Sequence, residues 1–455
     1  MAAQGHCAPR FRRVREVFEQ NFAAGEELGA AFAVYLDGEP VVDLWDGVAD
    51  RHTGREWQKD TPVLTYSCTK AVTATVLLRL AERGAVDVTA PVAGVWPEFA
   101  AAGKAQVTVE HLLTHQSGLP VLEHPIPAQD LGDLPAIAAH LAQQPPLWAP
   151  GTAHGYHALT YGFLTGEVVR RATGKTVGTL LSEEIATPRD LDMWLDAPED
   201  VIPRAARLSA GDRTPTPRKS EVLPARPAAA APAPAEDEVP PARRGPAAGT
   251  DARRFPGTGT EATAGTGTGV ERAVADAVVM SEGPGRAGNP RDVAVLAALD
   301  KDSLMSRAMG NPNPNLLKGG ANHPVIMRAG WPAMGLVTTA RALAGFYRDL
   351  VAGELLAPET LRDATRRRVQ GPDRVLVLDS SFGLGYMRPS LTFPVPRAAQ
   401  ESAFGHTGLG GSLGLGDVRH RLGMAYTMNR LSQAITGSLR AYRLTEAVYA
   451  CLEKD

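Results

Sequence analysis

A tract rich in proline, alanine and glycine divides this 455-residue chain into two patterned parts. Ten of the 36 prolines stand between residues 211 and 260, and Phe255 is the only aromatic residue from 211 to 270. Such a stretch has too few large apolar side chains to offset the conformational entropy that is lost on folding. We therefore expect residues 211–290 to be a flexible insertion, and the folded body to be built from the segments on both sides of it.

Apolar patterns on the two sides of the tract predict both helices and strands. Residues 8–27 carry apolar side chains near helical spacing. Apolar runs on both sides of Asp37-Gly38 are typical of a β-hairpin. Strand-like runs return between 381 and 430, and a closing helix is expected near 434–453. The chain ends therefore favour a mixed α/β structure.

Composition excludes several classes of protein. Hydrophobic residues make up 44% of the chain, which is enough for a sizeable core. The 47 basic and 50 acidic residues give a formal net charge of −3, so no charge excess indicates a nucleic acid or an anionic membrane as partner. No run of about 18 apolar residues is present, and the N-terminal MAAQGHCAPRFRRVREVFEQ lacks the apolar region of a secretory signal. We expect a cytoplasmic protein, and its oligomeric state stays open.

The cysteines and short motifs give no sign of a cofactor. Cys7, Cys68 and Cys451 lie far apart and make neither a disulfide framework nor a metal knuckle. Neither a phosphate-binding glycine loop nor an H-E-x-x-H pattern occurs in a suitable context. The sequence therefore predicts an activity without a metal or an organic cofactor.

The tetrapeptide Ser67-Cys68-Thr69-Lys70 is the sharpest chemical signal in the chain. At the start of a helix, residues three apart lie on one face, so the Lys70 amine can lie beside the Ser67 hydroxyl. A partly desolvated lysine can take the proton that makes serine a nucleophile, and a helix N-terminus favours developing negative charge. The alternative is a serine N-cap followed by a solvated lysine, because S-x-x-K alone is a permissive motif.

A second serine lies in a pattern that belongs to another class of hydrolase. Gly410-Gly411-Ser412-Leu413-Gly414 spells G-x-S-x-G, which in α/β-hydrolases forms a sharp turn between a strand and a helix. Here the following residues read as two strands around a turn. We therefore interpret Ser412 as structural.

Two later segments place the first motif in a family context. The segment 147–169 carries Tyr156 after a Pro-Gly turn, and 403–417 contains His406-Thr407-Gly408 beside an apparent strand. In this order, the three elements resemble the S-x-x-K, Y-x-N and K-T-G motifs of the serine β-lactamases and penicillin-binding proteins. Details such as LLTHQSGLP and RAMGNP are similar to the class C-like branch, which includes the family VIII carboxylesterases and related transesterases.

The resemblance covers about residues 10–205 and 295–450 and implies the β-lactamase/transpeptidase-like fold. That fold combines an antiparallel sheet flanked by helices with an all-α subdomain. We expect 8–80 and 320–453 to form the discontinuous α/β domain and 81–205 to form the mainly helical subdomain. The reactive serine would then lie in the cleft between these two parts.

The same resemblance assigns roles to individual residues. Ser67 matches the acylated nucleophile, and Lys70 matches the amine that assists proton removal. Tyr156 matches the tyrosine whose phenolate acts as second base and as acid for the leaving group. Because a phenol titrates near about 10, nearby cations or donors must hold it ionised. The backbone N–H groups of Ser67 and Leu409 would form the oxyanion hole, next to Gly408.

Two positions depart from the family pattern. Ala158 replaces the asparagine of Y-x-N, which removes an amide that would hold Lys70 and a substrate amide. His406 replaces the lysine of K-T-G and is mostly neutral near pH 7, although it can still donate a hydrogen bond to Tyr156 or to a carbonyl. Without that permanent cation, we expect substrates that bear a carboxylate to bind less well than neutral esters.

Other residues near the motifs receive smaller roles. Trp148 and His154 are candidates for lining the cleft. His115 is interpreted as a hydrogen-bonding residue at a helix end, and His157 is expected to point away from its neighbour Tyr156. Cys68 is interpreted as a small buried apolar residue.

The expected reaction is acyl transfer through a Ser67 acyl-enzyme. With water as acceptor the protein is a carboxylesterase acting on small neutral esters. A transacylase that moves the acyl group to an alcohol or amine in specialised metabolite biosynthesis stays an alternative, because the shape and dryness of the site choose the acceptor. A non-catalytic scaffold with the same fold is a further alternative, and the retained Ser67, Lys70 and Tyr156 argue against it.

Overall fold

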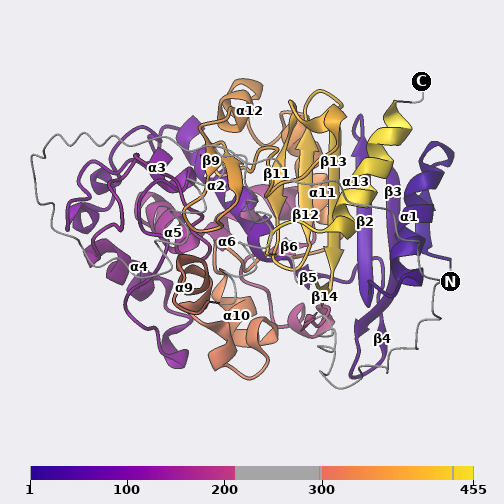
Figure 1. The fold of residues 1–455 in the computed structure, drawn as a ribbon, viewed down its shortest axis with the longest axis horizontal. Helices are drawn as coiled ribbons and strands as arrows, with labels where there is room; N and C mark the ends of the chain where they lie inside the picture. The colour runs from indigo at the N-terminus through magenta and orange to yellow at the C-terminus, as the bar shows by residue number, and fades with distance from the viewer. Residues whose placement is uncertain (1, 211–296, 298–299, 433–434, 454–455) are drawn as a thin grey trace, which may run out of the picture. The chain divides into compact units, whose positions relative to one another are not determined.

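A computed structural model describes residues 2–210, 297, 300–432 and 435–453 (Figure 1). All of these residues belong to one unit of the fold. The flexible insertion expected at 211–290 lies outside the described residues. The proposed division into an α/β domain and a helical subdomain stays a prediction.

An antiparallel sheet made from both ends of the chain lies to the right in Figure 1. Along the sheet the strands follow the order β1-β3-β2-β13-β12-β11, with β4 paired to β3. Its strands are β1 (Gln4–Cys7), β2 (Gly29–Leu36), β3 (Glu39–Asp50), β4 (Arg55–Glu56), β11 (Ala403–Thr407), β12 (Leu413–Asp417) and β13 (Leu422–Met428). All their pairings are antiparallel, as the sequence predicted.

The predicted hairpin is confirmed and joins β2 to β3. Its two turn residues, Asp37 and Gly38, have φ angles of 53° and 87°, which is the left-handed conformation that short hairpin turns need. On its other side β2 pairs with β13, from Leu36 opposite Leu422 to Ala30 opposite Met428. This pairing is where the first and last parts of the chain become one sheet.

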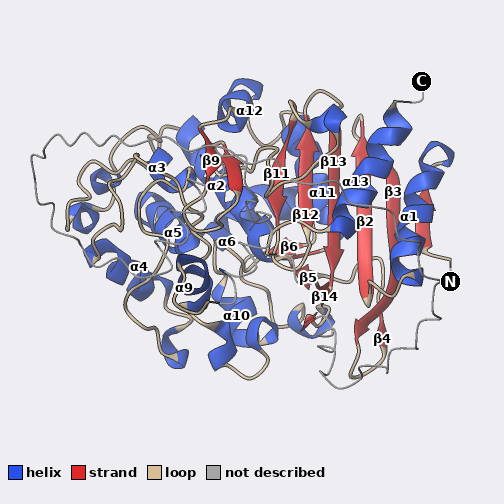
Figure 2. Ribbon diagram, viewed as in Figure 1, coloured by secondary structure: helices blue, strands red, loops and turns tan. Residues whose placement is uncertain are grey.

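Helices cover both faces of the sheet (Figure 2). Helix α11 (Ala340–Val351) packs on a face made of small residues, whereas α1 (Arg12–Ala23) and α13 (Leu439–Leu452) cover the opposite face. The small residues are Ala31, Ala33, Gly414, Gly416 and Gly423, and the opposite face presents Phe32, Val34, Leu44, Leu415 and Met424. A Cβ on Gly423 would lie 2.5 Å from the backbone nitrogen of Arg348, so α11 approaches the sheet too closely for larger side chains.

The middle of the chain is mainly helical and lies to the left in Figure 1, as predicted. Helix α2 (Thr69–Glu82) follows the 3₁₀ turn η2 (Tyr66–Cys68) and is buried along most of its length. Around it lie α3 (Val109–Leu113), α4 (Leu134–Gln143), α5 (Thr160–Thr173) and α6 (Val177–Leu181). The later helices are α9 (Leu304–Gly310), α10 (Pro324–Ala329) and α12 (Pro358–Thr365).

Short strands form further small sheets outside the main sheet. They are β5 (Val63–Leu64) with β8 (Val337–Thr338) and β6 (Met193–Trp194), β7 (Ser209–Ala210) with β14 (Arg430–Leu431), and β9 (Val369–Pro372) with β10 (Asp379–Phe382). The strand expected at 381–387 is interrupted after Phe382. Residues 383–386 turn, with the Gly385 N–H donated to the carbonyls of Leu113 and Gly383, and Met387 then forms a β-bridge with Gly405 of β11.

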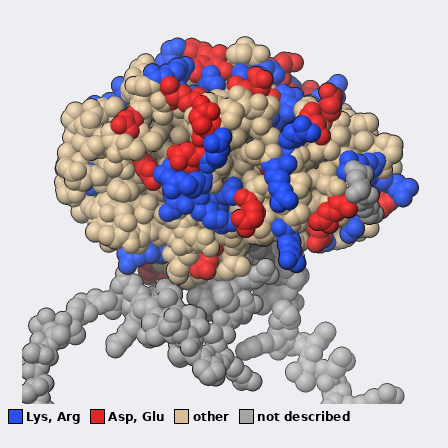
Figure 3. Space-filling model, turned by 90° about the horizontal axis from the view of Figure 1, so that it is seen from above, with Lys and Arg blue, Asp and Glu red and all other residues tan. Residues whose placement is uncertain are grey.

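Charges of both signs are mixed on the face of the molecule seen in Figure 3, with wide uncharged areas between them. That face therefore offers no uniformly basic surface for nucleic-acid phosphates. Within the described ranges, no helix combines the length and apolar character that crossing a bilayer requires. The same residues contain no group of three or more His, Cys, Asp or Glu side chains arranged to hold a metal ion.

Candidate active site

Ser67 lies in the short 3₁₀ turn η2, two residues before α2 begins at Thr69, rather than at the first position of the α-helix itself. The preceding Tyr66 has a φ of 49°, a conformation that a large side chain rarely adopts. Hydrogen bonds hold it there: the Thr69 hydroxyl donates to the Tyr66 carbonyl at 2.5 Å and accepts from the Leu336 N–H at 3.0 Å. The turn thus presents the Ser67 side chain, which is partly exposed, at a fixed position.

Lys70 is completely buried and its amine lies beside Ser67, as predicted. The Nζ atom is 3.1 Å from Ser67 Oγ, 2.7 Å from the Ala158 carbonyl and 3.1 Å from the Ala333 carbonyl. Burial lowers the pKa of Lys70 well below its usual range. Since carbonyls only accept, a neutral amine gives them its two hydrogens and turns its lone pair towards the Ser67 hydroxyl.

The backbone at Ala158 therefore does what the missing asparagine was expected to do for Lys70. The sequence indicated that this substitution removes a group that holds the lysine. In the structure the carbonyl of the same residue accepts from Nζ at 2.7 Å. A backbone contact of this kind leaves no signal in residue identity.

Tyr156 is buried against the other side of Ser67. Its side chain makes a hydrogen bond with the Ser67 side chain, and Lys70 Nζ lies 4.7 Å from the centre of its ring. The ring stacks on Phe382 at 6.1 Å between centroids. Burial raises the pKa of the Tyr156 phenol well above its ordinary value, although the bond with Ser67 opposes this. Burial thus favours the neutral phenol, and the expected roles of Tyr156 as second base and as acid stay predictions.

His406 lies in β11, next to Tyr156, with 6.0 Å between the ring centroids. Burial, together with the charge of Lys70, lowers the pKa of His406 to about 3, so the expectation of a neutral histidine is confirmed. Its Nδ1 lies 2.7 Å from the carbonyl of Thr407 and donates to it, because a carbonyl only accepts. Nε2 is then an acceptor, and it has no hydrogen-bond partner among the described residues.

A tight turn at residues 408–412 carries Leu409 and lies close to Thr65, two residues before Ser67. The Gly408 N–H donates to the Ser412 carbonyl at 2.8 Å and closes this turn between β11 and β12. A Cβ on Gly408 would lie 2.3 Å from the Thr65 carbonyl, so only glycine allows the strand to come this close. Leu409 is partly exposed like Ser67, whereas Gly408 is buried. The oxyanion hole assigned to the N–H groups of Ser67 and Leu409 stays a prediction.

Ser412 does not stand in a nucleophile elbow. It is fully buried, and strand β12 follows it where an elbow would have a helix. Its hydroxyl has no hydrogen-bond partner among the described residues, so nothing there activates it as a nucleophile. The structural interpretation of the G-x-S-x-G pattern is consistent with this environment.

The residues expected to line the site support the loop that carries Tyr156 (residues 153–158). Trp148 Nε1 donates to the Ala153 carbonyl at 3.0 Å, and His154 Nε2 lies 3.0 Å from the hydroxyl of Ser380. Both side chains are buried. Contact of Trp148 or His154 with a substrate stays a prediction.

His115, which follows α3, and His157, which lies in the loop itself, both fix the conformation of this loop. His115 Nδ1 accepts the backbone N–H of His157 at 3.1 Å, which confirms its hydrogen-bonding role. The His157 ring donates from Nδ1 to the Gly155 carbonyl and accepts the Leu119 N–H at Nε2. The His157 ring therefore faces the segment that contains Leu119, which agrees with the expectation that it points away from Tyr156. Cys68 is a buried free cysteine, also as expected.

Asp373 is the supporting residue that the sequence did not reveal. It is buried, and its Oδ1 accepts the backbone N–H groups of Tyr156, Val375 and Leu376, each at 2.9 Å. Its Oδ2 accepts the hydroxyl of Ser380 at 2.8 Å. One carboxylate thus ties the β9–β10 hairpin to the loop of Tyr156. In the sequence Asp373 is one acidic residue among many and carries no motif.

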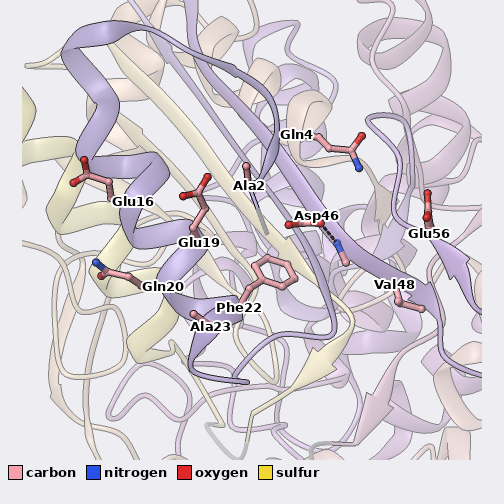
Figure 4. A pocket seen from close by; sticks show the side chains of 11 residues that line it. Ala2, Gln4, Glu16, Glu19, Gln20, Phe22, Ala23, Asp46, Val48 and Glu56 are labelled. Atoms are coloured by element: carbon pink, nitrogen blue, oxygen red, sulfur yellow. Dashed lines mark hydrogen bonds between the residues drawn. The ribbon is translucent and has the colours of Figure 1, made fainter.

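A large hollow of about 910 Å³ lies elsewhere, between α1 and the strands β1 and β3 (Figure 4). The close view shows Glu16 and Glu19 from the helix and Asp46 from the sheet around it, with Asp46 accepting the N–H of the following residue. None of the candidate catalytic residues lines this hollow. This hollow is therefore separate from the site around Ser67.

Comparison with known proteins agrees with this arrangement. The sequence profile of the family described as "Beta-lactamase" matches residues 14–448. The chain belongs to this family and is a serine hydrolase of the esterase/β-lactamase type with the β-lactamase/transpeptidase-like fold.

Individual relatives are similar over nearly the whole chain. "Esterase/beta-lactamase LipL" of Mycobacterium tuberculosis is 34% identical over 440 residues, which are 94% of this chain and 83% of LipL. A crystal structure of a family VIII carboxylesterase is 30% identical, with a TM-score of 0.75 over 99% of this chain and 100% of the other. A penicillin-binding protein homologue from Caulobacter crescentus is 33% identical, with a TM-score of 0.74 and the same coverage.

Proposed function

We propose that this protein is a carboxylesterase that hydrolyses small neutral esters through an acyl-enzyme on Ser67. The observation that carries the proposal is the position of the Ser67 hydroxyl, between the buried amine of Lys70 at 3.1 Å and the phenol of Tyr156. A nucleophile in contact with both a base and an acid is what acyl transfer requires. The esterase names of two of the relatives described above are consistent with it.

In the acylation step, Lys70 is the base. Its neutral amine takes the proton of Ser67 as Oγ attacks the ester carbonyl. The resulting ammonium has three hydrogens, and three acceptors surround Nζ: the carbonyls of Ala158 and Ala333, and Ser67 Oγ. The site therefore stabilises the charged form only once the proton has been transferred.

Tyr156 is the acid in the same step. Its phenol gives a proton to the departing alkoxide, which leaves as the free alcohol, and Lys70 then returns the proton from Ser67 to the phenolate. Lys70 Nζ lies 4.7 Å from the centre of the Tyr156 ring, so the two groups that exchange this proton are neighbours in the site. A water molecule reverses the sequence in deacylation and regenerates the serine hydroxyl. The backbone N–H groups of Ser67 and Leu409 stabilise the oxyanion in both steps.

The neutral state of His406 supports the preference for uncharged esters. Its pKa of about 3 means that it carries no charge at pH 7, so the third motif supplies no cation for a substrate carboxylate. A neutral ester needs no such partner. Its recognition depends on the oxyanion donors and on apolar contacts.

Steady-state kinetics on p-nitrophenyl acetate tests the proposal with two matched serine variants. Ser67→Ala should lose at least about 10³-fold in kcat, because the nucleophile is gone. Ser412→Ala, in the competing G-x-S-x-G motif 345 residues later in the chain, should keep kcat within about twofold. Hydrolysis retained by a folded Ser67→Ala protein would contradict the mechanism. Turnover that depends on an added alcohol or amine would instead identify a transacylase.

A further inference from the structure

The turn at 408–412 is held from outside the sheet by the last helix of the chain. The carbonyl of Gly410 accepts two hydrogen bonds, one from the backbone N–H of Ser432 at 2.9 Å and one from Arg440 Nη2 at 3.1 Å. Arg440 is the second residue of α13. The Gly410 carbonyl lies two peptide units after the Leu409 N–H, so this guanidinium holds the same tight turn as the predicted oxyanion donor.

The guanidinium of Arg440 is itself fixed by several acceptors. Nη1 donates to the Glu26 carbonyl at 2.8 Å and to Glu27 Oε2 at 2.7 Å, while Nη2 also donates to the Arg430 carbonyl at 2.8 Å. The hydroxyl of Tyr426 in β13 donates to the other carboxylate oxygen of Glu27. The Arg440 side chain is only 6% exposed and that of Glu27 only 1%.

This ion pair is unavailable to a substrate and costly to bury. Its charges neutralise each other inside the protein, so Arg440 does not replace the cation that is absent at His406. Removing two charges from water costs several kcal/mol per ion in general, and a buried pair is weak evidence for stability. A positional role accounts for an arginine here, because a planar guanidinium can bind several fixed carbonyls at once.

The start of α13 packs directly against the same turn. A Cβ on Gly411 would lie 2.9 Å from the Ser438 hydroxyl and 3.4 Å from Arg440 Nη2. The Ser438 hydroxyl caps the helix by accepting the Ala441 N–H at 3.2 Å, and it donates to the Gly411 carbonyl at 3.4 Å. Helix and turn therefore move together.

We propose that Arg440 is a positioning residue for the reaction: by holding the Gly410 carbonyl, it orients the neighbouring Leu409 N–H towards the oxyanion that forms at Ser67. The proposal rests on the function proposed above. Glu27 serves as the internal counter-ion that keeps the guanidinium in this place. Catalysis by oriented backbone donors depends on geometry to well within 1 Å, so a loosened turn costs rate without removing any reacting group.

A double variant that replaces the pair tests this proposal. In Glu27→Gln with Arg440→Met, glutamine still accepts the Tyr426 hydroxyl and no uncompensated charge is left buried. We expect a folded protein whose kcat on p-nitrophenyl acetate falls about 10- to 100-fold with KM unchanged. Affinity for phenylboronic acid, which forms a tetrahedral adduct on serine, should fall by the same factor. Equal losses in kcat and boronate affinity distinguish positioning from a purely structural role.

Three single variants complete the experiment. Arg440→Lys keeps a cation for Glu27, but one ammonium cannot bind all these acceptors, so a smaller loss of about tenfold is expected in kcat and in boronate affinity. Glu27→Gln leaves the Gly410 contact in place but buries the guanidinium without its counter-ion, so it should lower the unfolding free energy and reduce kcat and boronate affinity less than the double variant does. Arg10→Met removes a contact with the far end of α13, the 3.0 Å bond to the Cys451 carbonyl, and should leave kcat unchanged.

Unchanged kcat and boronate affinity in the folded double variant would overturn the proposal. If the double variant does not fold, unchanged kcat and boronate affinity in Arg440→Lys would overturn the proposal instead. Failure of the underlying function has a different signature, because the unmodified protein would then form neither an acyl-enzyme nor a boronate adduct.

Discussion

The hydrogen-bond capacity of one amine explains why the Ser67 site suits acyl transfer. Lys70 Nζ has two carbonyl neighbours that accept hydrogens in either protonation state, and a hydroxyl neighbour that can donate or accept. Burial favours the neutral amine before the reaction. The third contact therefore reverses direction as the proton passes from Ser67 to Lys70, and no side chain has to move.

Lys70→Arg should abolish most activity, although it keeps a positive charge and a long side chain. An arginine stays protonated in proteins and cannot take the proton of Ser67, so we expect kcat on p-nitrophenyl acetate to fall about 10³- to 10⁴-fold. Lys104 provides the matched control. It is also buried with its amine on two carbonyls, those of Ala101 and Gln144, but it is not part of the site. Activity retained in Lys70→Arg, with Lys104→Arg unaffected, would exclude Lys70 as the base.

His406→Lys should change which substrates the enzyme accepts. A lysine can pair with a substrate carboxylate, whereas the neutral imidazole supplies an uncharged contact, and the difference is about 1 kcal/mol. We expect kcat/KM for a cephalosporin to rise about 5- to 10-fold and that for a neutral ester to fall, because the new cation is close to Lys70. Kinetics on one substrate of each kind measures this. Efficient cephalosporin hydrolysis by the unmodified enzyme would contradict the argument.

Residue identity predicted part of this site and missed the rest for a physical reason. Ser67, Lys70 and Tyr156 are recognisable because their chemistry depends on their side chains and on motif spacing. The supports of Lys70 are backbone carbonyls, at Ala158 and Ala333, that any residue could supply. The protonation of Tyr156 could not be predicted either, since it depends on burial by groups distant in sequence.

The β9–β10 hairpin is the element that fixes Tyr156 from behind. Its Asp373 accepts three backbone N–H groups, including that of Tyr156, and its last residue Phe382 stacks on the tyrosine ring. The hairpin lies more than 200 residues after the tyrosine in the sequence. Such support can be recognised only when the fold brings the two segments together.

Asp373→Ala should destabilise the protein and disorder the catalytic tyrosine. Each buried N–H that loses its acceptor costs about 1 to 3 kcal/mol, so three of them predict a loss of at least about 3 kcal/mol in unfolding free energy. We expect kcat to fall about tenfold or more at temperatures where the variant is still folded. Denaturant unfolding and ester kinetics measure the two effects. Asp379→Ala, at an exposed acidic residue of the same hairpin, is the control and should change neither quantity.

The elements themselves were predictable where local patterns agreed with the fold. The hairpin at Asp37-Gly38 and the helix that begins after Ser67 follow from turn residues and apolar spacing. Strand β1 was missed, since only four residues form it and its pairing with β3 defines it. The expected strand at 381–387 is interrupted because hydrogen bonding at Gly385 overrides the local pattern, and the chain pairs with β11 again at Met387.

For the molecule as a whole, buried histidines around the site make its stability depend on pH. Burial lowers the pKa of His157, and burial with the Lys70 charge lowers that of His406, to about 3 in each case. An unfolded chain binds a proton on each of them below about pH 6.5, and the folded protein does not. Their contribution to stability is therefore complete above about pH 6.5 and is lost progressively as the pH falls towards 3.

The unfolding free energy should accordingly fall between pH 7.5 and 4.5, by roughly 3 kcal/mol for each of these two histidines. His157→Gln removes one of these two histidines. The difference between its unfolding free energies at the two pH values should therefore be smaller by roughly 3 kcal/mol. Denaturant titrations at both pH values measure it. His52→Gln, at an exposed histidine, should behave like the unmodified protein. An unchanged pH dependence in His157→Gln would show that this residue does not carry the effect.

The most direct test of the central claim is to locate the acyl group in an enzyme quenched during turnover. Intact-protein mass spectrometry after brief exposure to p-nitrophenyl acetate, followed by peptide mapping, gives both the number of acyl groups and their site. We predict one acetyl group per chain on the peptide that contains Ser67, the same adduct in Ser412→Ala, and none in Ser67→Ala. An acetyl group on any other residue, or an acylated Ser67→Ala protein, would contradict the account.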